Sequence, residues 1–468
     1  MPHPIIEISE LTQLIIDQCL LLGNKRSLVS LACTCRALEE QALSALWSEE
    51  PSLRNLVRST LPREIIYPRK PLHKPTNAEW DRFRRYASWM RRLTLDRDFD
   101  ESEEIFPLMP SSWLDEVVFP GLRKLHWPAN PHTLPFHRLL LSPTLTTLSL
   151  KYYSFGSSEE DFSILRPVIM GLDTSHLRDL YLRWFVREEA NRQMESVASC
   201  AVLRCGPALK GLGVSSSLSD AAVQHIMQLP NLSTWCASTG LPRRPNLSPS
   251  DIFPRLNYLT LAGEVSLEWL AFFTTTAHHI SSGRGSHSSS NRGPVQRLCH
   301  LHISTGVSIN AVLMSHIMHF RELTFLNLLS NCDWEGCAFS LTDDDIAEIT
   351  SALSRLVHAV LGMVCSANSC RTTVASLVSF STQCRDLESL EVHFNTANLR
   401  NDLESVTADP RLDNLPSLRT SNDFHLSLTD APLAIDDDDS VSVLSGFRRI
   451  FPSLVAIGGG EIPWGPWI

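Results

Sequence analysis

The sequence predicts an α+β chain in which a small N-terminal bundle of three helices precedes a long α/β solenoid. Two observations support this prediction. Apolar residues recur at helical spacing through about the first fifty residues. Behind them, one pattern recurs to the end of the chain. It consists of a leucine, any two residues, a second leucine, any one residue and a third apolar residue. The segments between the copies, typically about twenty residues, are long enough to return as helices outside a stack of short parallel strands.

The N-terminal bundle is predicted from three short amphipathic segments. The apolar face of the first is made by Leu11, Leu14, Ile15, Cys19 and Leu22. Gly23 and Asn24 end it, because both residue types tolerate the left-handed conformation at a helix C-terminus. The other two stripes are made by Leu28, Leu31, Ala32 and Cys35, and by Leu38, Ala42, Ala45, Leu46 and Trp47. Three helices of this size cannot bury all of these side chains among themselves, so the surplus predicts an interface.

This segment resembles the F-box, in the form common among fungal F-box proteins. The shared features are an opening proline with aliphatic neighbours, an apolar run that contains a cysteine and a basic residue, and a closing Leu-Trp. They are carried by Pro4, Ile5, Ile6, Leu11, Leu14, Ile15, residues 27–38 and residues 42–47. The Leu-Pro opening typical of the family is absent, since Pro4 precedes Ile5. The resemblance places an F-box-like helical domain over residues 1–50, and an ordinary helical N-terminal subdomain is the alternative interpretation.

Composition narrows the class of protein. The 468 residues are 43% hydrophobic and 20% charged, which is typical of a folded chain of more than one compact core. A net charge of −10 argues against a general nucleic-acid binder. No run of eighteen apolar residues and no basic signal-peptide start is found. The 12 scattered cysteines are typical of reduced thiols, so we expect an intracellular protein, cytoplasmic or nuclear, without a membrane partner.

Residues 51–89 are predicted to be a basic, proline-rich linker that ends in a helix over Asn77 to Met90. Between Arg63 and Arg92 there are nine Lys or Arg against three acidic residues, with four prolines in the surrounding stretch. We interpret the basic run as a solvated face, with binding of an anionic partner as the alternative.

Residues 90–468 are predicted to form the solenoid. Its strands are expected at the patterns that begin with Met90, Leu122, Leu145, Leu177, Leu209, Leu232, Leu256, Leu298, Leu323, Leu387, Leu418 (a weak copy) and Leu454. The interval from Leu323 to Leu387 is 64 residues, which predicts one degenerate copy near residues 353–360. In each copy the alternating apolar residues should point into a shared core.

The array resembles the leucine-rich repeat in a lengthened, irregular form, and Asn331 and Asn395 complete the family pattern in two copies. The resemblance implies a horseshoe with parallel strands on its concave face and helices outside. Segments 218–227 and 341–349 are predicted to be capped helices, because Ser or Thr precedes aspartate in the first turn of each. A generic α/β protein with chance leucine spacing is the alternative interpretation.

Several segments interrupt the array. Residues 281–294 are of low complexity and predicted to be disordered, and residues 241–250 form a proline-rich loop. The acidic residues Asp436 to Asp439 are expected in a solvated loop. The C-terminal residues 464–468, which include two tryptophans, are expected to cap the end of the solenoid.

The sequence contains no phosphate-binding loop, nucleophile elbow or zinc-protease motif. The cysteine pairs at 332/337 and 365/370 are too irregular for structural zinc. Cys384, beside Arg385 and Asp386, is the nearest candidate for a nucleophile, but its place just before a strand pattern indicates a structural residue. We therefore expect no catalytic residue, no metal and no cofactor.

An F-box-like bundle followed by leucine-rich repeats resembles the substrate receptors of cullin-based SCF ubiquitin ligases. The resemblance implies that the bundle docks on a Skp-type adaptor, and through it on a cullin, while the array binds a protein substrate. Carried over onto matching positions, the adaptor contacts are Pro4, Ile5, Leu11, Ile15, Leu28, Leu31, Cys35, Leu43, Leu46 and Trp47. Trp47 is the expected anchor, since large aromatic residues dominate interface energetics.

Residues between and beside the strand leucines are expected on the face that binds a substrate. They are Tyr181, Arg183, Tyr258, His300, His302, Asn327, Glu391 and His393. Two alternatives from other classes stay open. One is a leucine-rich-repeat scaffold for protein interactions without a ubiquitin role, and the other is an enzyme whose site lies in a loop insertion.

Overall fold

The computed structural model describes a large part of the chain, and every structural statement below concerns that part. The described residues are 9–34, 36–48, 52–62, 74–95, 105–153, 158–185, 188–237, 253–262, 269, 298–305, 308–330, 339–362, 371–392, 395, 399–408, 412, 424–427 and 437–458. The chain divides into two compact units, Met1–Ser216 and Ser217–Ile468. Both belong to the α/β class, and each is described by itself.

Helices form the described N-terminal part of the first unit. They are α1 (Ser9–Leu21), α2 (Lys25–Thr34), α3 (Arg36–Ser48), α4 (Leu53–Thr60) and α6 (Asn77–Trp89). The three predicted N-terminal helical segments and the helix after the linker are thus confirmed. Gly23 has a φ of 63° after α1, the left-handed conformation expected of that stop. Thr76 and Glu79 form a capping box at the start of α6, in which each side chain satisfies a backbone N–H of the other residue.

Five parallel strands follow in chain order in the first unit. They are β1 (Arg92–Thr94), β2 (Lys124–Ala129), β3 (Thr147–Tyr153), β4 (Asp179–Phe185) and β5 (Gly211–Val214). One leucine from each strand occupies the same register position, and each is no more than 1% exposed: Leu93, Leu125, Leu148, Leu180 and Leu212. Full burial of one such side chain contributes about 1.5 to 3 kcal/mol. The recurring leucines therefore form the continuous core that the sequence predicted.

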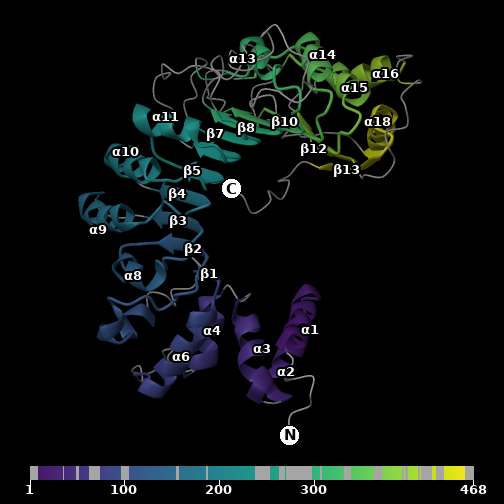
Figure 1. The fold of residues 1–468 in the computed structure, drawn as a ribbon. Coiled ribbons are helices and arrows are strands. Elements are labelled where there is room, and N and C mark those ends of the chain that lie inside the picture. Colours follow the sequence, from purple (N-terminus) through teal and green to yellow (C-terminus); the bar gives the residue numbers. More distant parts are fainter. Residues whose placement is uncertain are drawn as a thin grey trace, which may run out of the picture. The chain divides into compact units, whose positions relative to one another are not determined.

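Helices cover one face of this strand array (Figure 1). They are α8 (His137–Leu140), α9 (Ser158–Gly171) and α10 (Glu188–Leu203). Side chains that alternate with the core leucines, such as Lys151 and Arg183, lie on the other face, which we call the polar strand face of the first unit. A strand presents successive side chains to opposite faces, which is why core and polar residues alternate.

The second unit repeats this arrangement with eight strands. They are β6 (Thr234–Ala237), β7 (Tyr258–Ala262), β8 (His300–Thr305), β9 (Phe325–Ser330), β10 (His358–Leu361), β11 (Ser389–Val392), β12 (Phe424–Ser427) and β13 (Leu454–Gly458). They pair in parallel in chain order. One buried apolar residue from each of the strands β7 to β12 is aligned in register with those of its neighbours. These residues are Leu259, Leu301, Leu326, Ala359, Leu390 and Leu426.

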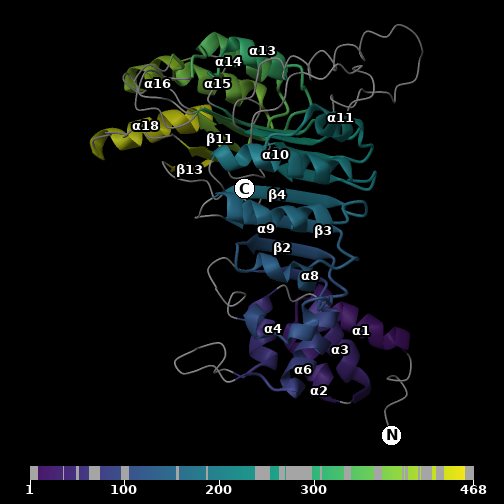
Figure 2. The same cartoon turned by 90° about the vertical axis from the view of Figure 1, so that its left-hand side faces the viewer.

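The helices of the second unit are α11 (Asp220–Gln228), α13 (Ala311–Ile317), α14 (Asp343–Ala352), α15 (Val374–Gln383), α16 (Leu399–Thr407) and α18 (Asp437–Ile450). Figures 1 and 2 show α13, α14, α15 and α16 side by side along one face of strands β8 to β12. The two helices predicted from their caps are confirmed as α11, capped by Ser219, and α14, capped by Thr342. Both caps accept a hydrogen bond from a backbone N–H in the first turn.

Most strand predictions are confirmed, and two local ones need comment. The degenerate copy expected near residues 353–360 is β10. The weak copy at Leu418 lies outside the described residues, and β12 begins at Phe424. The loop predicted for Asp436 to Asp439 is wrong for its last three residues, because α18 begins at Asp437. Aspartate is favoured near the N-terminus of a helix, so an acidic run in the sequence is compatible with a helix start as well as with a loop.

The interrupting segments 241–250 and 281–294 and the C-terminal segment 464–468 lie outside the described residues. The domain boundaries at residues 50 and 89 stay predictions. Among the described helices, none combines the length and apolar character needed to cross a lipid bilayer.

Candidate functional site

The first candidate surface lies on the outer sides of α1 and α2. The buried face of α1 is made by Thr12 and Ile16, which are 3% and 1% exposed. The apolar stripe of α1 points away from this face and into solvent, and Val29 of α2 is exposed with it. We call the exposed set the apolar helix surface, and its members are Leu11, Leu14, Ile15, Leu21, Leu22 and Val29, between 40% and 81% exposed. A cluster of exposed large apolar side chains marks an interaction site.

The predicted adaptor contacts separate into four groups. Leu11 and Ile15 belong to the apolar helix surface. Leu31, Leu43 and Leu46 are half-buried, whereas Leu28 and Trp47 are buried. Pro4, Ile5 and Cys35 lie outside the described residues. The adaptor interface stays a prediction. The exposure of the described candidates shows that a partner can reach Leu11 and Ile15 more readily than Leu28 and Trp47.

Trp47, the expected anchor, is packed inside the first unit. Its side chain is 6% exposed, and its indole stacks on Tyr86 of α6 with ring centroids 5.3 Å apart. Tyr86 in turn stacks on Trp89 at 5.5 Å. Trp47 therefore joins α3 to α6 in this structure, and Leu14, Leu21, Leu22 and Val29 expose more apolar surface than it does.

The second candidate surface is the polar strand face of the second unit. Four rings on adjacent strands form a ladder there, namely Tyr258, His300, Phe325 and His358, with successive centroids 5.5, 5.7 and 6.0 Å apart. All four occupy one register position and are half-buried. Such a ladder offers a partner a row of half-buried rings, and interface cores are enriched in aromatic residues.

Both histidines of the ladder favour the neutral form. Burial lowers the pKa of His300, and the neighbouring His358 lowers it further. Burial also lowers the pKa of His358, although Glu388, whose Oε2 lies 4.0 Å from its Nε2, acts in the opposite direction. At neutral pH the ladder therefore presents uncharged rings, which suit contact with an apolar or aromatic side chain of a partner.

The next register position on the same face contains His302, Asn327 and Glu391. Burial lowers the pKa of His302 to about 4 and raises the pKa of Glu391. Asn327 is fully buried, and neither its amide nitrogen nor its amide oxygen has a hydrogen-bond partner. This differs from the expectation that Asn327 presents its amide to a substrate. His393 lies outside the described residues.

Tyr181 and Arg183, the two substrate-binding candidates on β4, lie on the polar strand face of the first unit. The Tyr181 ring leans over Gly211 of β5, where a Cβ atom would lie 2.7 Å from its hydroxyl oxygen. The same Cβ would lie 2.7 Å from a carboxylate oxygen of Asp179. Gly211 thus leaves the space that the Tyr181 hydroxyl and the Asp179 carboxylate occupy. Arg183 lies two residues beyond Tyr181 on the same face of β4.

Two of the described thiols, those of Cys205 and Cys384, are buried. Burial raises the pKa of Cys384 to about 12 and that of Cys205 to about 11. A thiol with so high a pKa is protonated at neutral pH and unreactive. Within the described ranges, no group of three or more His, Cys, Asp or Glu side chains is arranged to hold a metal ion.

Comparison with known proteins adds no further assignment. No protein-family model and no curated protein matches the chain. The function has to be argued from the surfaces themselves.

Sequence reasoning missed part of both surfaces. Leu21 and Val29 fell outside the stripes drawn for the first two helices, and both are exposed. Phe325 and His358 complete the ring ladder, and each directly precedes the second apolar residue of its strand pattern. Comparing that position across copies would have aligned them with Tyr258 and His300.

Proposed function

We propose that this chain is the substrate-recognition subunit of a cullin-based SCF ubiquitin ligase. Its N-terminal helices would dock on a Skp-type adaptor, and its repeats would bind a protein substrate. The observation that carries the proposal is the outward orientation of the α1 stripe, in which Leu14, Leu21 and Leu22 are 63%, 81% and 71% exposed. A helix that turns its leucines outward while burying a threonine is arranged for a partner that covers them.

In this proposal the chain performs no reaction. It holds a substrate near the ubiquitin-charged enzyme and so raises the effective concentration of a target lysine. The ring ladder of Tyr258, His300, Phe325 and His358 supports the second half of the proposal, because a row of half-buried rings is suited to a peptide or protein surface. The buried thiols Cys205 and Cys384 agree with a receptor that acts by positioning alone.

A scaffold without a ubiquitin role is the second candidate. It is favoured by Trp47, since the residue expected to anchor the adaptor is stacked on Tyr86 and only 6% exposed. In a scaffold the apolar helix surface would bind a different protein, and the polar strand faces would act as proposed above.

The test is capture of a purified Skp-type adaptor by the full chain. Leu14→Glu combined with Leu21→Glu places two charges on the apolar helix surface without touching the core, so we expect capture to be lost while folding is retained. The matched control is Leu114→Glu with Leu203→Glu, which charges two leucines of the same unit that are 40% and 45% exposed, and it should keep capture.

Leu28→Asp or Trp47→Ala would not serve here, because both side chains are buried and their loss would disturb folding. Failure of the folded wild-type chain to capture the adaptor, or equal capture by both double variants, would reject the ligase proposal in favour of the scaffold.

A further inference from the structure

The polar strand face of the first unit brings three positively charged side chains and one histidine together on three adjacent strands. Lys124 and His126 lie on β2, Lys151 on β3 and Arg183 on β4. We call these four residues the basic strand cluster. Lys151 and Arg183 are directly opposed Cα partners in the β3–β4 pair, and Lys124 is opposed to Arg92 of β1 in the same way.

This arrangement is unfavourable in the isolated protein. Like charges at directly opposed positions destabilise a sheet. Within the part of the chain that the structure describes, Lys124, Lys151 and Arg183 have no ion pair to offset the repulsion. Asp179, the acidic residue on the described strands of this face, accepts a hydrogen bond from the Thr147 hydroxyl at 3.0 Å and lies four residues before Arg183.

The electrostatics of the cluster agree with its geometry. Burial lowers the pKa of Lys151, and the charge of Arg183 lowers it further. Burial also lowers the pKa of His126, with added effects of Lys151 and Lys124. The charge of Arg183 thus disfavours the charged form of Lys151, and Lys151 and Lys124 disfavour that of His126, which agrees with a site that lacks a counter-charge.

We propose that the basic strand cluster binds an acidic, extended segment of a partner protein through its aspartate and glutamate side chains. The cluster runs diagonally from Lys124 to Arg183 over two strand spacings and four residues, a distance of about 16 Å. An extended segment of about five residues spans this distance and presents alternate side chains to one face. Acidic residues at alternate positions would thus meet His126, Lys151 and Arg183 in turn.

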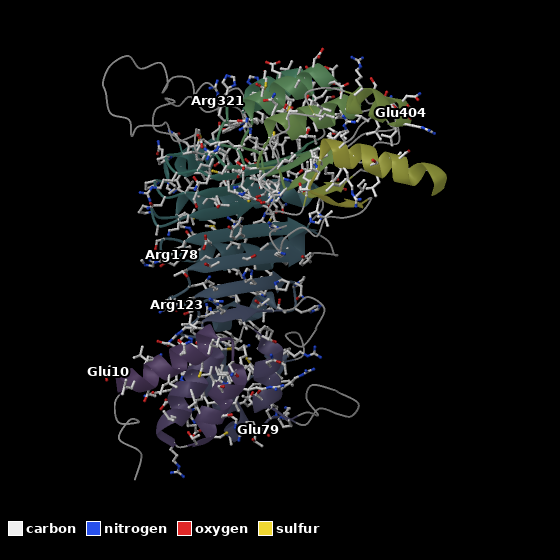
Figure 3. The ribbon with its side chains drawn as sticks, turned by 90° about the vertical axis from the view of Figure 1, so that its right-hand side faces the viewer. Glu10, Glu79, Arg123, Arg178, Arg321 and Glu404 are labelled. Atoms are coloured by element: carbon white, nitrogen blue, oxygen red, sulfur yellow. The ribbon has the colours of Figure 1, made fainter. Side chains whose placement is uncertain are left out.

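The surroundings favour an acidic protein segment over nucleic acid. The net charge of −10 repels a long polyanion, whereas a short segment meets only the local cluster. Stacking of bases needs open aromatic faces, but Tyr181 beside the cluster is half-buried and held against Gly211. Arg123 and Arg178, which are exposed and precede β2 and β4 at the same end of the strands (Figure 3), extend the positive potential along that edge.

This inference names a partner class for the substrate-binding face, and it rests on that half of the proposed function but not on adaptor docking. The test measures binding of the full chain to a fluorescent peptide of about ten residues that alternates aspartate with serine. A peptide with asparagine in place of aspartate is the reference. We expect the aspartate peptide to bind roughly tenfold more tightly than the reference, with an affinity that falls as salt is raised from about 50 to about 200 mM.

Lys151→Gln with Arg183→Gln is expected to weaken binding of the aspartate peptide roughly tenfold. Arg166→Gln with Arg321→Gln is the matched control, since it removes two exposed arginines outside the strand face and should leave binding unchanged. Equal binding by these two variants would overturn the proposal. Tighter binding of an oligothymidine of equal length would also overturn it, because that result assigns the cluster to nucleic acid.

The same two variants are then used in adaptor capture, where both should behave like the wild type. A chain that captures the adaptor but binds neither peptide keeps the ligase proposal and loses this one. A chain that binds the aspartate peptide but captures no adaptor keeps the proposal for the basic strand cluster and rejects the ligase proposal.

Discussion

The indole of Trp47 and the ring of Tyr86 stack with their centroids 5.3 Å apart and their planes 20° apart. This contact joins α3 to α6 across 39 residues of sequence. It also changes how the N-terminal helices are interpreted, because an aromatic residue that the sequence assigns to a partner is used within the unit. The apolar residues left for a partner are those of α1 and α2.

Trp47→Ala is expected to lower the free energy of unfolding by about 3 to 5 kcal/mol, since it removes a large side chain that is 6% exposed. In a double-mutant cycle with Tyr86→Ala, the coupling energy should be about 0.5 to 1.5 kcal/mol. Chemical denaturation of the four proteins measures both values. A cost below about 1 kcal/mol for Trp47→Ala would show that the stack is not maintained in solution.

Asp343 connects two neighbouring helices of the second unit. Its carboxylate accepts hydrogen bonds from the backbone N–H and hydroxyl of Thr373, at 2.8 and 2.7 Å, and from the hydroxyl of Ser376. Asp343→Ala leaves these groups at the start of α15 without their acceptor and should cost about 1 to 3 kcal/mol of stability. Asp344→Ala, at the exposed neighbouring position, should cost less than about 1 kcal/mol. Equal losses of stability in urea titrations would contradict the role given to Asp343.

Lys151→Met should raise the free energy of unfolding by about 0.2 to 1 kcal/mol, because it removes the charge opposed to Arg183 and keeps the apolar stem. Arg166→Met, on the exposed side of α9, should stay within about 0.5 kcal/mol of the wild type. Thermal and urea unfolding measure the difference. A clear loss of stability in Lys151→Met would mean that the charge is compensated in the free protein, against the inference drawn from the cluster.

The stability of the second unit should depend on pH through His302. Its folded-state pKa of about 4 lies below the ordinary value of 6.5, because burial disfavours the charged ring. The unfolded chain therefore binds the proton more readily, and stability present above about pH 6.5 is lost as the pH falls towards about 4, by up to about 3 kcal/mol.

His302→Gln should remove this part of the pH dependence, whereas His132→Gln, at an exposed position of the first unit, should retain it. The uncharged residues Thr260 and Asn327 flank His302 in register and add no titration of their own. Urea titrations at about pH 7 and about pH 4.5 compare the three proteins. An unchanged pH dependence in His302→Gln would reject burial of a neutral imidazole.

The sequence by itself determined the elements that depend on local patterns. The leucine spacing placed nearly every described strand, since alternation of buried and exposed side chains is a property of the strand itself. Ser219 and Thr342 marked helix starts because a cap bonds only within its own first turn. The apolar surplus of the first helices could likewise be counted without a structure.

Only the tertiary structure decided which side chains those elements leave exposed. The sequence indicated that the first helices carry more apolar residues than they can bury, but not which of them stay exposed. The packing of α1 buries Thr12 and Ile16 and leaves Leu11, Leu14 and Ile15 exposed. Trp47 meets Tyr86, and Lys151 faces Arg183, through contacts between segments distant in the chain. Such pairings depend on register and on the angle at which helices pack, which no local pattern specifies, and both proposed binding surfaces arise from them.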